Sequence, residues 1–500
     1  MREKEYLGQR YAAIVSAAGV ILLIAGVLML SPLVLIIVYP EEVGNAAGFA
    51  VPGGFLVVAG LVLWRRLRPA MRVTLSIQEG GVIVLLSWIL VILFSAWPFV
   101  SALELPFSRA LFESVSGWTT TGLSVVDVAS AGPMILLWRS LTQLAGGAGL
   151  AIIMMSTIIG PTGVGISSAE GRSDQLVPHV RQSARLVLVM YSCYTAAGAL
   201  AYRLAGMSLF DAVNHAFAAV STGGFSTRAA SIGHWNSVAV EAVTIPLMLL
   251  GNLSFLTAWF LWRGRFRPVF RNSEIRLLVF LIPSAAAALF VLTSRALYPH
   301  LGKSIRVTVF ETVTAITTTG FSTVGYGDWN AFGLLLIINL MLIGGGTCST
   351  AGGIKQFRIY LLGKLVYWEI RRLLLPRSAV MERPVWEGGR RIFLDDARLL
   401  RTGIFVFLYL ATCAIGTMVL CACGFSLPAS LFEFASAIGT VGLSVGVTSP
   451  GMPDVALWAE MLAMFLGRLE FIVVVVSVIK LGRDGLQALG TTSSENHRHA

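Results

Sequence analysis

The segment Phe112-Glu113-Ser114-Val115-Ser116-Gly117-Trp118-Thr119-Thr120-Thr121-Gly122-Leu123-Ser124 has three later counterparts in the chain. They contain Asn214-His215 with Ser221-Thr222-Gly223-Gly224-Phe225-Ser226, Phe310-Glu311 with Thr317-Thr318-Thr319-Gly320-Phe321-Ser322, and Phe432-Glu433 with Gly439-Thr440-Val441-Gly442-Leu443-Ser444. A glutamate, or His215 in its place, always stands nine positions before the aligned glycine. The aligned glycines are 102, 96 and 122 residues apart, which indicates four internal repeats.

The composition places these repeats in a membrane. Hydrophobic residues make up 56% of the 500 residues and charged residues only 13%, whereas a soluble domain carries about 25% charged residues. Apolar runs long enough to cross about 30 Å of hydrocarbon are found at 11–38, 49–64, 81–100, 132–156, 184–205, 238–262, 277–294, 331–370, 401–423 and 455–480. The run 331–370 is expected to be one span that a glycine-rich break interrupts. The sequence thus predicts about ten crossings.

Four shorter apolar stretches, of about 11 residues, are too short to cross the bilayer. They lie at 108–119, 209–220, 306–317 and 429–439, and each leads into one of the glycine-threonine clusters. Arginine-rich linkers at 65–72, 172–185, 263–276 and 371–401 are expected in the cytoplasm. The net charge of +11 therefore reflects these linkers rather than a nucleic-acid surface. The short stretches fall on the outer side, and both termini are expected inside.

This arrangement suits a cation. A short helix that ends within the membrane directs its negative C-terminal end toward the centre, and the following glycine lets carbonyls turn toward a common axis. Four such strands can form rings of oxygens that replace the water around an ion. The predicted potassium ligands are Thr120, Thr121, Gly122, Thr222, Gly223, Gly224, Thr318, Thr319, Gly320, Thr440, Val441 and Gly442. The alternative is a set of tight re-entrant turns with no ion path.

The four segments resemble those of the TrkH/TrkG/KtrB superfamily of potassium uptake proteins. Three further features support the resemblance, namely the break Gly344 to Lys355, Arg468 within Leu466-Gly467-Arg468-Leu469-Glu470, and Trp138-Arg139-Ser140 leading to Gly146-Gly147. The resemblance covers residues from about 80 to 480, and the two additional N-terminal spans look like the TrkH branch.

The resemblance implies an all-α polytopic membrane protein with four pseudo-symmetric helix–pore-helix–helix repeats around a central pore, plus two N-terminal transmembrane helices. It also implies a homodimer in which each protomer has its own pore, a cytosolic nucleotide-binding RCK ring (TrkA-like) as regulator, and the bacterial cytoplasmic (inner) membrane as location. The expected boundaries are an N-terminal extension 1–78, repeats 79–172, 173–270, 271–395 and 396–485, and a mobile tail 486–500.

The third repeat contains a second candidate filter. Thr323-Val324-Gly325-Tyr326-Gly327-Asp328 spells the potassium-channel signature, yet its glycine lies five residues later than the alignment requires. The register of the other repeats favours Gly320, so residues 323–328 are expected to form the loop that leaves the filter.

A gate is expected below the filter. The break frees backbone groups that need polar neighbours or water, and Arg468 places a charge in an apolar run. The predicted gate residues are Gly344, Gly345, Gly346, Thr347, Cys348, Ser349, Thr350, Gly352, Gly353 and Arg468. The alternatives are a kink for close helix packing and, for Arg468, a pair with Glu470. Arg139 is expected to form a salt bridge with a short-helix glutamate. Glu113, Glu311 and Glu433 lie too early on their helices to reach the ion, so capping or packing contacts are expected instead.

The functional hypothesis is potassium uptake through this filter, with the potassium ion as bound cargo. In related plant proteins a serine in the first filter goes with sodium preference, so glycine in all four repeats favours potassium. Sodium permeation, or coupling to protons or sodium, remains the alternative. No nucleophile–base arrangement or phosphate loop is apparent, so the sequence does not indicate an enzyme.

Overall fold

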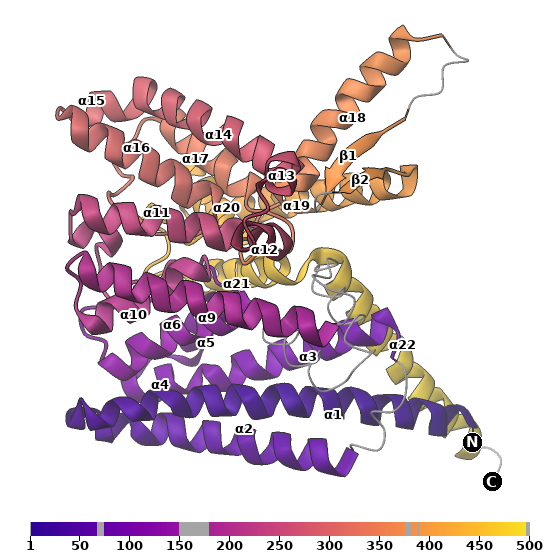
Figure 1. The fold of residues 1–500 in the computed structure, drawn as a ribbon. Coiled ribbons are helices and arrows are strands. Elements are labelled where there is room, and N and C mark those ends of the chain that lie inside the picture. The colour runs from indigo at the N-terminus through magenta and orange to yellow at the C-terminus, as the bar shows by residue number, and fades with distance from the viewer. Residues whose placement is uncertain (1, 68–74, 150–179, 377–381, 388–389, 497–500) are drawn as a thin grey trace.

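The computed structural model describes residues 2–67, 75–149, 180–376, 382–387 and 390–496. Most of its helices run side by side in one bundle. The first three repeats follow one another across Figure 1 in chain order, whereas the fourth lies in the middle of the view, between the first and the third. The all-α polytopic class is thus confirmed, with one small addition, a β-hairpin of β1 (Pro384–Glu387) and β2 (Arg390–Phe393) inside the predicted cytoplasmic linker 371–401.

The helices divide into an N-terminal pair and four similar groups. The pair is α1 (Arg2–Leu30) and α2 (Ala46–Leu67). The first group is α3 (Ile77–Ser95), α4 (Trp97–Leu103), α5 (Phe107–Trp118) and α6 (Pro133–Ala148). The second is α9 (Val180–Leu204), α10 (Leu209–Val220), α11 (Val238–Asn252), α12 (Phe255–Trp262) and α13 (Phe266–Arg271). The third is α14 (Ser273–Leu289), α15 (Arg295–Leu297), α16 (Leu301–Ile316), α17 (Ala331–Ile343) and α18 (Gln356–Leu374). The fourth is α19 (Asp396–Ala422), α20 (Leu427–Gly439), α21 (Asp454–Leu469) and α22 (Phe471–Asn496).

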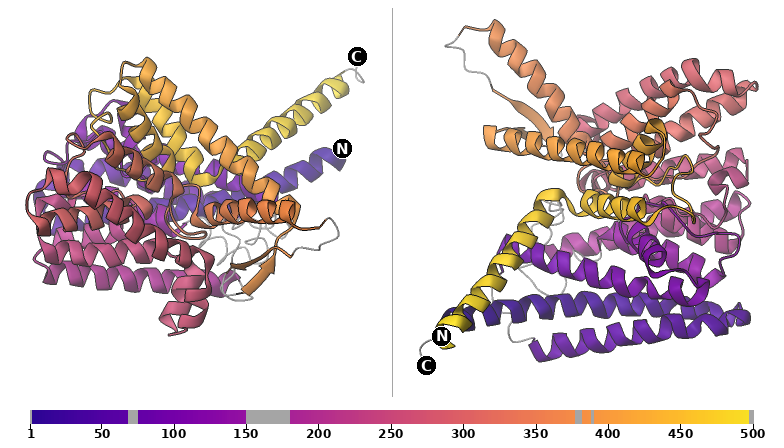
Figure 2. Two further views of the ribbon diagram at one scale, coloured as in Figure 1. Left: turned by 90° about the horizontal axis from the view of Figure 1, so that it is seen from above. Right: turned by 180° about the vertical axis from the view of Figure 1, so that it is seen from behind.

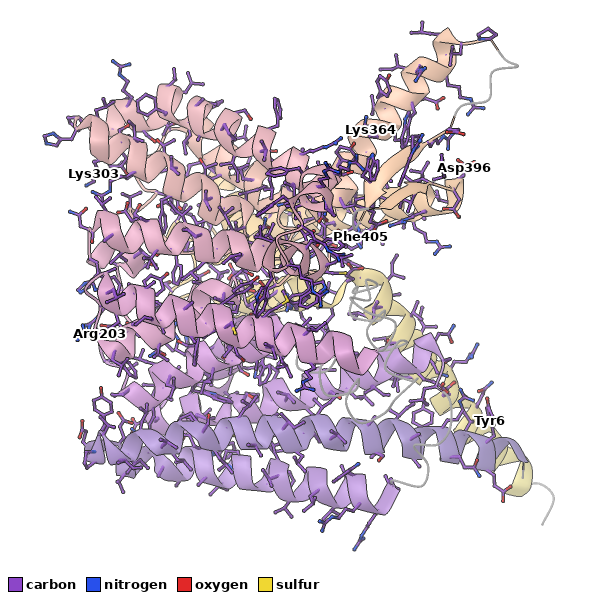
Figure 3. All side chains as sticks on the ribbon, viewed as in Figure 1. Tyr6, Arg203, Lys303, Lys364, Asp396 and Phe405 are labelled. Carbon is purple, nitrogen blue, oxygen red and sulfur yellow. The ribbon has the colours of Figure 1, made fainter. Side chains whose placement is uncertain are left out.

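Large apolar side chains cover the outside of the bundle. Phe280 is 72% exposed on α14, Phe407 is 71% exposed on α19, and Leu204 is 80% exposed at the end of α9. A soluble protein rarely exposes so much apolar surface, so lipid is the solvent for these faces. Charged side chains gather toward the ends, where Figure 3 labels Arg203 and Lys303 at one end and Lys364 and Asp396 at the other.

Among the described residues, five helical segments are long and apolar enough to span a membrane, or seven if each bent pair counts as one span. The predicted count of about ten also included α6, α9 and the α17–α18 pair, which do not meet this criterion. For α6 the comparison is partial, because residues 150–156 of its predicted run lie outside the described part of the chain.

Within the described residues, the second long helix is broken in the second, third and fourth groups. α11 and α12 meet at 118°, and α21 and α22 meet at 99°, so that α22 leaves the bundle at a steep angle (Figure 2). The sequence predicts continuous spans over 238–262 and 455–480, and the structure corrects both predictions. Local capping explains the first bend, because Ser254 accepts a hydrogen bond from the Thr257 amide and begins a new helix. Only the break between α17 and α18 is predicted by its glycines.

The start of α1 and the end of α22 lie at the same end of the bundle (Figure 1). The Tyr11 hydroxyl donates to Asp484, with the two oxygens 2.9 Å apart. The hairpin and the outer part of α18 project from this end as well. α22 continues as helix to Asn496, so helical structure extends into the segment that the sequence analysis assigns to a mobile tail. The predicted domain boundaries remain predictions.

Candidate functional site: a ring of four re-entrant loops

The helices α5, α10, α16 and α20 are each followed by a loop with the same backbone conformation. A threonine adopts positive φ, and a glycine two residues later does so again. The threonines are Thr120 (56°), Thr222 (52°), Thr318 (51°) and Thr440 (49°), and the glycines are Gly122 (93°), Gly224 (75°), Gly320 (80°) and Gly442 (94°). Positive φ costs a β-branched residue about 1–2 kcal/mol. Its presence in all four repeats shows that one constrained loop geometry is built four times.

The four loops close into a ring in chain order. At each ring glycine, an added methyl group would collide with a carbonyl oxygen of a neighbouring loop. The separations from that methyl carbon are 2.2 Å for Gly122 to the Gly223 oxygen, 2.1 Å for Gly224 to Thr319, 1.9 Å for Gly320 to Val441, and 2.2 Å for Gly442 to Thr121. Because the last contact returns to the first loop, the ring has no free edge. Only glycine fits at these four positions.

The third repeat contributes Gly320 to this ring. A methyl group on Gly325 would meet no described atom within 4 Å. Gly325 lies instead in the segment that leads away from the ring, which is hydrogen-bonded to Glu311. We call the corresponding segment of each repeat its exit strand. The Thr323 amide and hydroxyl each donate to Glu311 at 2.8 Å, and the Tyr326 hydroxyl also donates to it.

The aligned glutamates hold exit strands rather than face the ring axis. Glu113 accepts hydrogen bonds from the Val125 and Val126 amides at 2.6 and 3.1 Å. Glu433 accepts from the Val445 and Thr448 amides at 3.1 and 3.0 Å. All three glutamates are fully buried. The prediction of capping and packing contacts is confirmed, although the capped groups belong to the exit strands and not to the short helices.

The second repeat has a histidine, His215, where the other three repeats have a glutamate. The His215 ring nitrogens lie 2.8 Å from the Asp211 carbonyl oxygen and 2.9 Å from the Ser226 hydroxyl. Gln143, on α6, supplies additional support. Its amide nitrogen donates to the Gly223 carbonyl at 2.6 Å, and its oxygen accepts from the Phe225 amide at 3.1 Å. Sequence analysis missed Gln143, although an amide side chain in an apolar helix is a recognisable signal of a polar partner.

Arg139 joins the first and second loops. Its Nε lies 3.3 Å from Glu113 Oε2, and its side chain is only 2% exposed. The guanidinium also lies over the Phe225 ring, 3.9 Å from the centroid, and donates to the Ser226 carbonyl. The predicted salt bridge with a short-helix glutamate is confirmed.

The side of the ring from which the exit strands leave opens into a cavity of about 260 Å³. All four ring glycines line it, together with Arg139, Arg228 and the exit strand of the third repeat. Arg228 is 45% exposed and pairs with Asp211 at 2.9 Å. An arginine at this mouth is a feature that the sequence analysis did not single out.

Residues 344–355, which form the break between α17 and α18, lie directly beneath the ring. We call this segment the intramembrane loop. The side-chain oxygens of Thr350 and Thr222 are 3.0 Å apart. The Gly352 amide donates to the Thr318 hydroxyl at 2.7 Å. A methyl group on Gly352 would lie 2.2 Å from the Gly439 carbonyl oxygen. The loop therefore touches the inner ends of the second, third and fourth filter strands.

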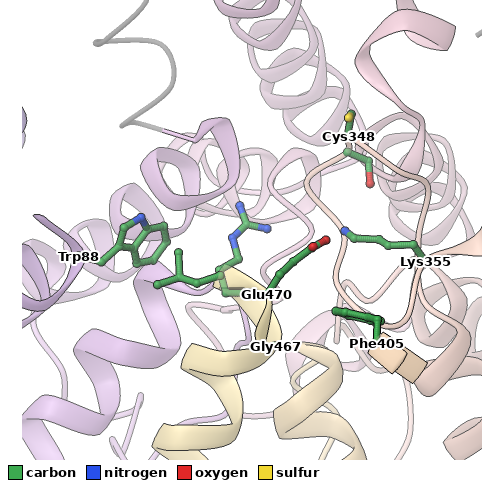
Figure 4. Close-up of a pocket in the computed structure, with 10 residues that line it drawn as sticks. Trp88, Cys348, Lys355, Phe405, Gly467 and Glu470 are labelled. Atoms are coloured by element: carbon green, nitrogen blue, oxygen red, sulfur yellow. The ribbon is translucent and has the colours of Figure 1, made fainter. Parts of the chain in front are cut away.

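Arg468 connects the intramembrane loop to the first repeat. Its guanidinium donates to the Thr350 carbonyl at 2.8 Å and to the Gly146 carbonyl at 2.5 Å. Glu470 pairs with Arg358 at 2.8 Å, so the structure does not support a simple Arg468–Glu470 pair. Figure 4 shows the residues that line the small cavity at this place: Lys355 of the loop points toward Glu470, and Trp88 lies on the opposite side of the view.

The remaining predicted gate residues hold the loop in shape. The Gly345 amide donates to the Gly352 carbonyl at 3.0 Å, and the Ile354 amide donates to Leu342 at 2.9 Å. The Gly346 amide donates to Asn252, and Cys348 accepts from the Phe255 amide, both in the α11–α12 bend. Gly344 and Gly353 pack closely, since a methyl group on Gly353 would lie 2.5 Å from the Gly344 Cα. Ser349 and Thr347 also lie within this loop.

A closed ring of four re-entrant loops in a polytopic helical bundle is the architecture of a membrane ion pathway. The chain belongs to the TrkH family of cation transport proteins, whose family model matches residues 53–486.

Individual relatives agree with this assignment. The chain is 32% identical over 423 residues to the Trk system potassium uptake protein TrkG of Escherichia coli, covering 81% of this chain and 85% of TrkG. It is 30% identical to an uncharacterized cation transporter of Methanocaldococcus jannaschii, covering 92% and 93% of the two chains. Its structure is similar to the crystal structure of the potassium transporter TrkH from Vibrio parahaemolyticus, with a TM-score of 0.82, 27% identity, and coverage of 94% and 98%.

Proposed function

We propose that this protein mediates potassium uptake across the bacterial cytoplasmic membrane through the ring of four loops. The observation that carries the proposal is the closure of the ring, in which a backbone carbonyl oxygen of each loop lies against a glycine of a neighbouring loop. Rings of carbonyl oxygens can replace the hydration shell of K⁺. The names of the relatives, potassium uptake proteins TrkG and TrkH, support potassium as cargo.

The filter in this proposal is formed by the twelve residues predicted from the sequence: Thr120, Thr121, Gly122, Thr222, Gly223, Gly224, Thr318, Thr319, Gly320, Thr440, Val441 and Gly442. The threonines stand at its inner end, where Thr222 and Thr318 contact the intramembrane loop. The potassium ion is the transported substrate.

The intramembrane loop and Arg468 form the gate in this proposal. The loop lies against the filter strands of the second, third and fourth repeats, and Arg468 links it to the first repeat through the Gly146 carbonyl. A positive charge below the filter also opposes cation passage. Opening then requires the loop to move away from the inner ends of the strands.

The proposal includes a homodimer, a cytosolic RCK-type nucleotide-binding ring as regulator, and an orientation with both termini in the cytoplasm. The orientation is supported by the arginine-rich linkers and by the shared position of the termini and the hairpin at one end of the bundle. A test is potassium uptake in a transport-deficient cell with and without a co-expressed RCK protein. Uptake that rises with the partner supports regulation, and uptake that the partner leaves unchanged contradicts it.

Ion flux in liposomes tests the transport activity itself. The purified protein should take up rubidium in preference to sodium, driven by the rubidium gradient alone. Sodium uptake without rubidium uptake would contradict the potassium assignment. Rubidium uptake that requires an imposed proton or sodium gradient would instead support the second candidate, an ion-coupled transporter.

A further inference from the structure

Three consecutive buried residues at the junction of α13 and α14 each bind a different element. Asn272 Nδ2 donates to the Thr257 hydroxyl of α12 at 2.8 Å. The Ser273 hydroxyl donates to the Trp386 carbonyl of β1 at 2.8 Å. Glu274 Oε1 accepts from the Thr347 amide of the intramembrane loop at 2.7 Å. The junction thus joins the α11–α12 bend, the hairpin and the loop.

The local structure fixes the position of the Glu274 side chain. Asn272 is the N-cap of α14, and its Oδ1 accepts from the Glu274 amide at 3.0 Å. Glu274 stands in the first turn of the helix, where the helix dipole favours a negative charge. The residue is 6% exposed, and a carboxylate accepting an amide proton in such a place forms a stronger bond than a neutral acceptor does.

The hairpin contacts the α13–α14 junction and also α18, the helix that follows the loop. On one side Trp386 binds Ser273, and the Arg271 guanidinium lies 5.0 Å from the Trp386 ring centroid. On the other side Val385 is buried in a small apolar cluster with Phe357 and Leu361 of α18. α18 begins directly after the loop, and the amide of its first residue, Gln356, donates to the Gly345 carbonyl at 2.8 Å. Figure 1 shows the hairpin between α13 and α18.

We propose that Glu274 is a positioning residue that holds the intramembrane loop beneath the ring. The neighbouring Ser273–Trp386 hydrogen bond connects Glu274 to the hairpin. A displacement of the hairpin would then move the start of α14 and the start of α18 together, and with them Thr347 and the C-terminal end of the loop. The predicted effect of Glu274 on ion flux rests on the proposed function, whereas its effect on the position of the loop does not. The position of the loop can be measured without conduction.

The first experiment measures rubidium flux into liposomes containing the purified protein without any partner. Glu274→Ala removes the bond that keeps the loop beneath the ring, so basal flux should rise about ten-fold, with an unchanged ratio of rubidium to sodium flux because the ring is untouched. Glu274→Gln keeps an acceptor oxygen and should give a smaller rise. Glu369→Ala, at an exposed position of α18, is the control and should leave flux unchanged.

A double-mutant cycle tests the connection to the hairpin. If Ser273 acts through Glu274, Ser273→Ala should raise flux, but the double variant should equal Glu274→Ala alone. Ser284→Ala, in the exposed part of the same helix, is the matched control. Fold-changes of the two single variants that multiply in the double variant would overturn the connection, and a Glu274→Ala flux equal to that of Glu369→Ala would overturn the positioning role.

The second experiment reports loop position directly. Cys348, in the loop, is 5% exposed, and a background in which Cys193, Cys413, Cys421 and Cys423 are replaced leaves it as the labelled thiol. Maleimide labelling of Cys348 should be faster in Glu274→Ala than in Glu369→Ala. Equal labelling rates would overturn the inference even if the protein conducts potassium. Faster labelling in a protein that conducts in no variant would support the inference and reject the proposed function.

Discussion

The hydroxyl oxygens of Thr222 and Thr350 lie 3.0 Å apart, so a filter strand of the second repeat and the intramembrane loop of the third repeat are in direct contact. Thr350 also donates to the Gly251 carbonyl at 2.9 Å, at the end of α11. The loop is therefore bonded both to the inner end of the ring and to the helix bend beside it. The proposed filter and the proposed gate are thus joined by hydrogen bonds, and we expect a change in one to alter the other.

If the ring is the filter, Gly320 and not Gly325 should set the selectivity of the third repeat. Gly320→Ser should reduce the ratio of rubidium to sodium permeability strongly, because its Cβ would lie 1.9 Å from the Val441 carbonyl oxygen. Gly325→Ser should change the ratio little, since its Cβ meets open space among the described residues. Bi-ionic flux in liposomes measures both ratios. A larger loss in Gly325→Ser would move the filter to the TVGYGD segment.

Arg468 should restrain the loop. Arg468→Ala removes hydrogen bonds to the carbonyls of Thr350 and Gly146, and bonds to a charged group contribute about 1.5–3 kcal/mol each. We expect basal rubidium flux to rise at least about ten-fold, with Arg468→Lys in between. Arg483→Ala, at an exposed position of α22, serves as the control. A flux that stays at the wild-type level would exclude Arg468 from the gate.

Removing one member of the buried Arg139–Glu113 pair should reduce the stability of the protein more than replacing both members. Arg139→Ala leaves the fully buried Glu113 without its opposite charge, which costs about 3–5 kcal/mol. The double variant Arg139→Met with Glu113→Gln should lose less stability than Arg139→Ala, because no buried charge remains unpaired. Thermal unfolding in detergent gives the comparison. A double variant that loses as much stability as Arg139→Ala would contradict this coupling.

Arg228 should reduce the cation concentration at the outer mouth. Arg228→Gln removes a half-exposed positive charge from the cavity above the ring and leaves Asp211 negative. Inward rubidium flux should increase about two-fold at low ionic strength and lose this gain near 1 M salt, where the screening length is about 3 Å. Lys303→Gln, exposed outside the cavity, is the control. A gain that persists at high salt would point to a change of shape rather than of charge.

Much of the site follows from the alignment of the repeats. Gly122 and its three counterparts can be placed in one ring because a shared spacing implies a shared structure, and Arg139 can be paired because a buried charge needs a partner. The bends at Ser254 and Glu470 could not be predicted, since the apolar pattern continues across them and the turns depend on caps and on contacts with the loop. Gln143 and Glu274 were missed for a related reason. Their partners are backbone groups far away in the sequence, which no local pattern reveals.

The intramembrane loop comes from one repeat only, although the ring is built from four. A gate formed by four equivalent parts would open through several partial displacements, and its current could pass through intermediate levels. Here a single segment covers the inner ends of three strands. Opening is then one event for each pore, so single-molecule recordings should show two current levels with exponentially distributed dwell times. In a dimer, two such pores would open independently and give three evenly spaced levels.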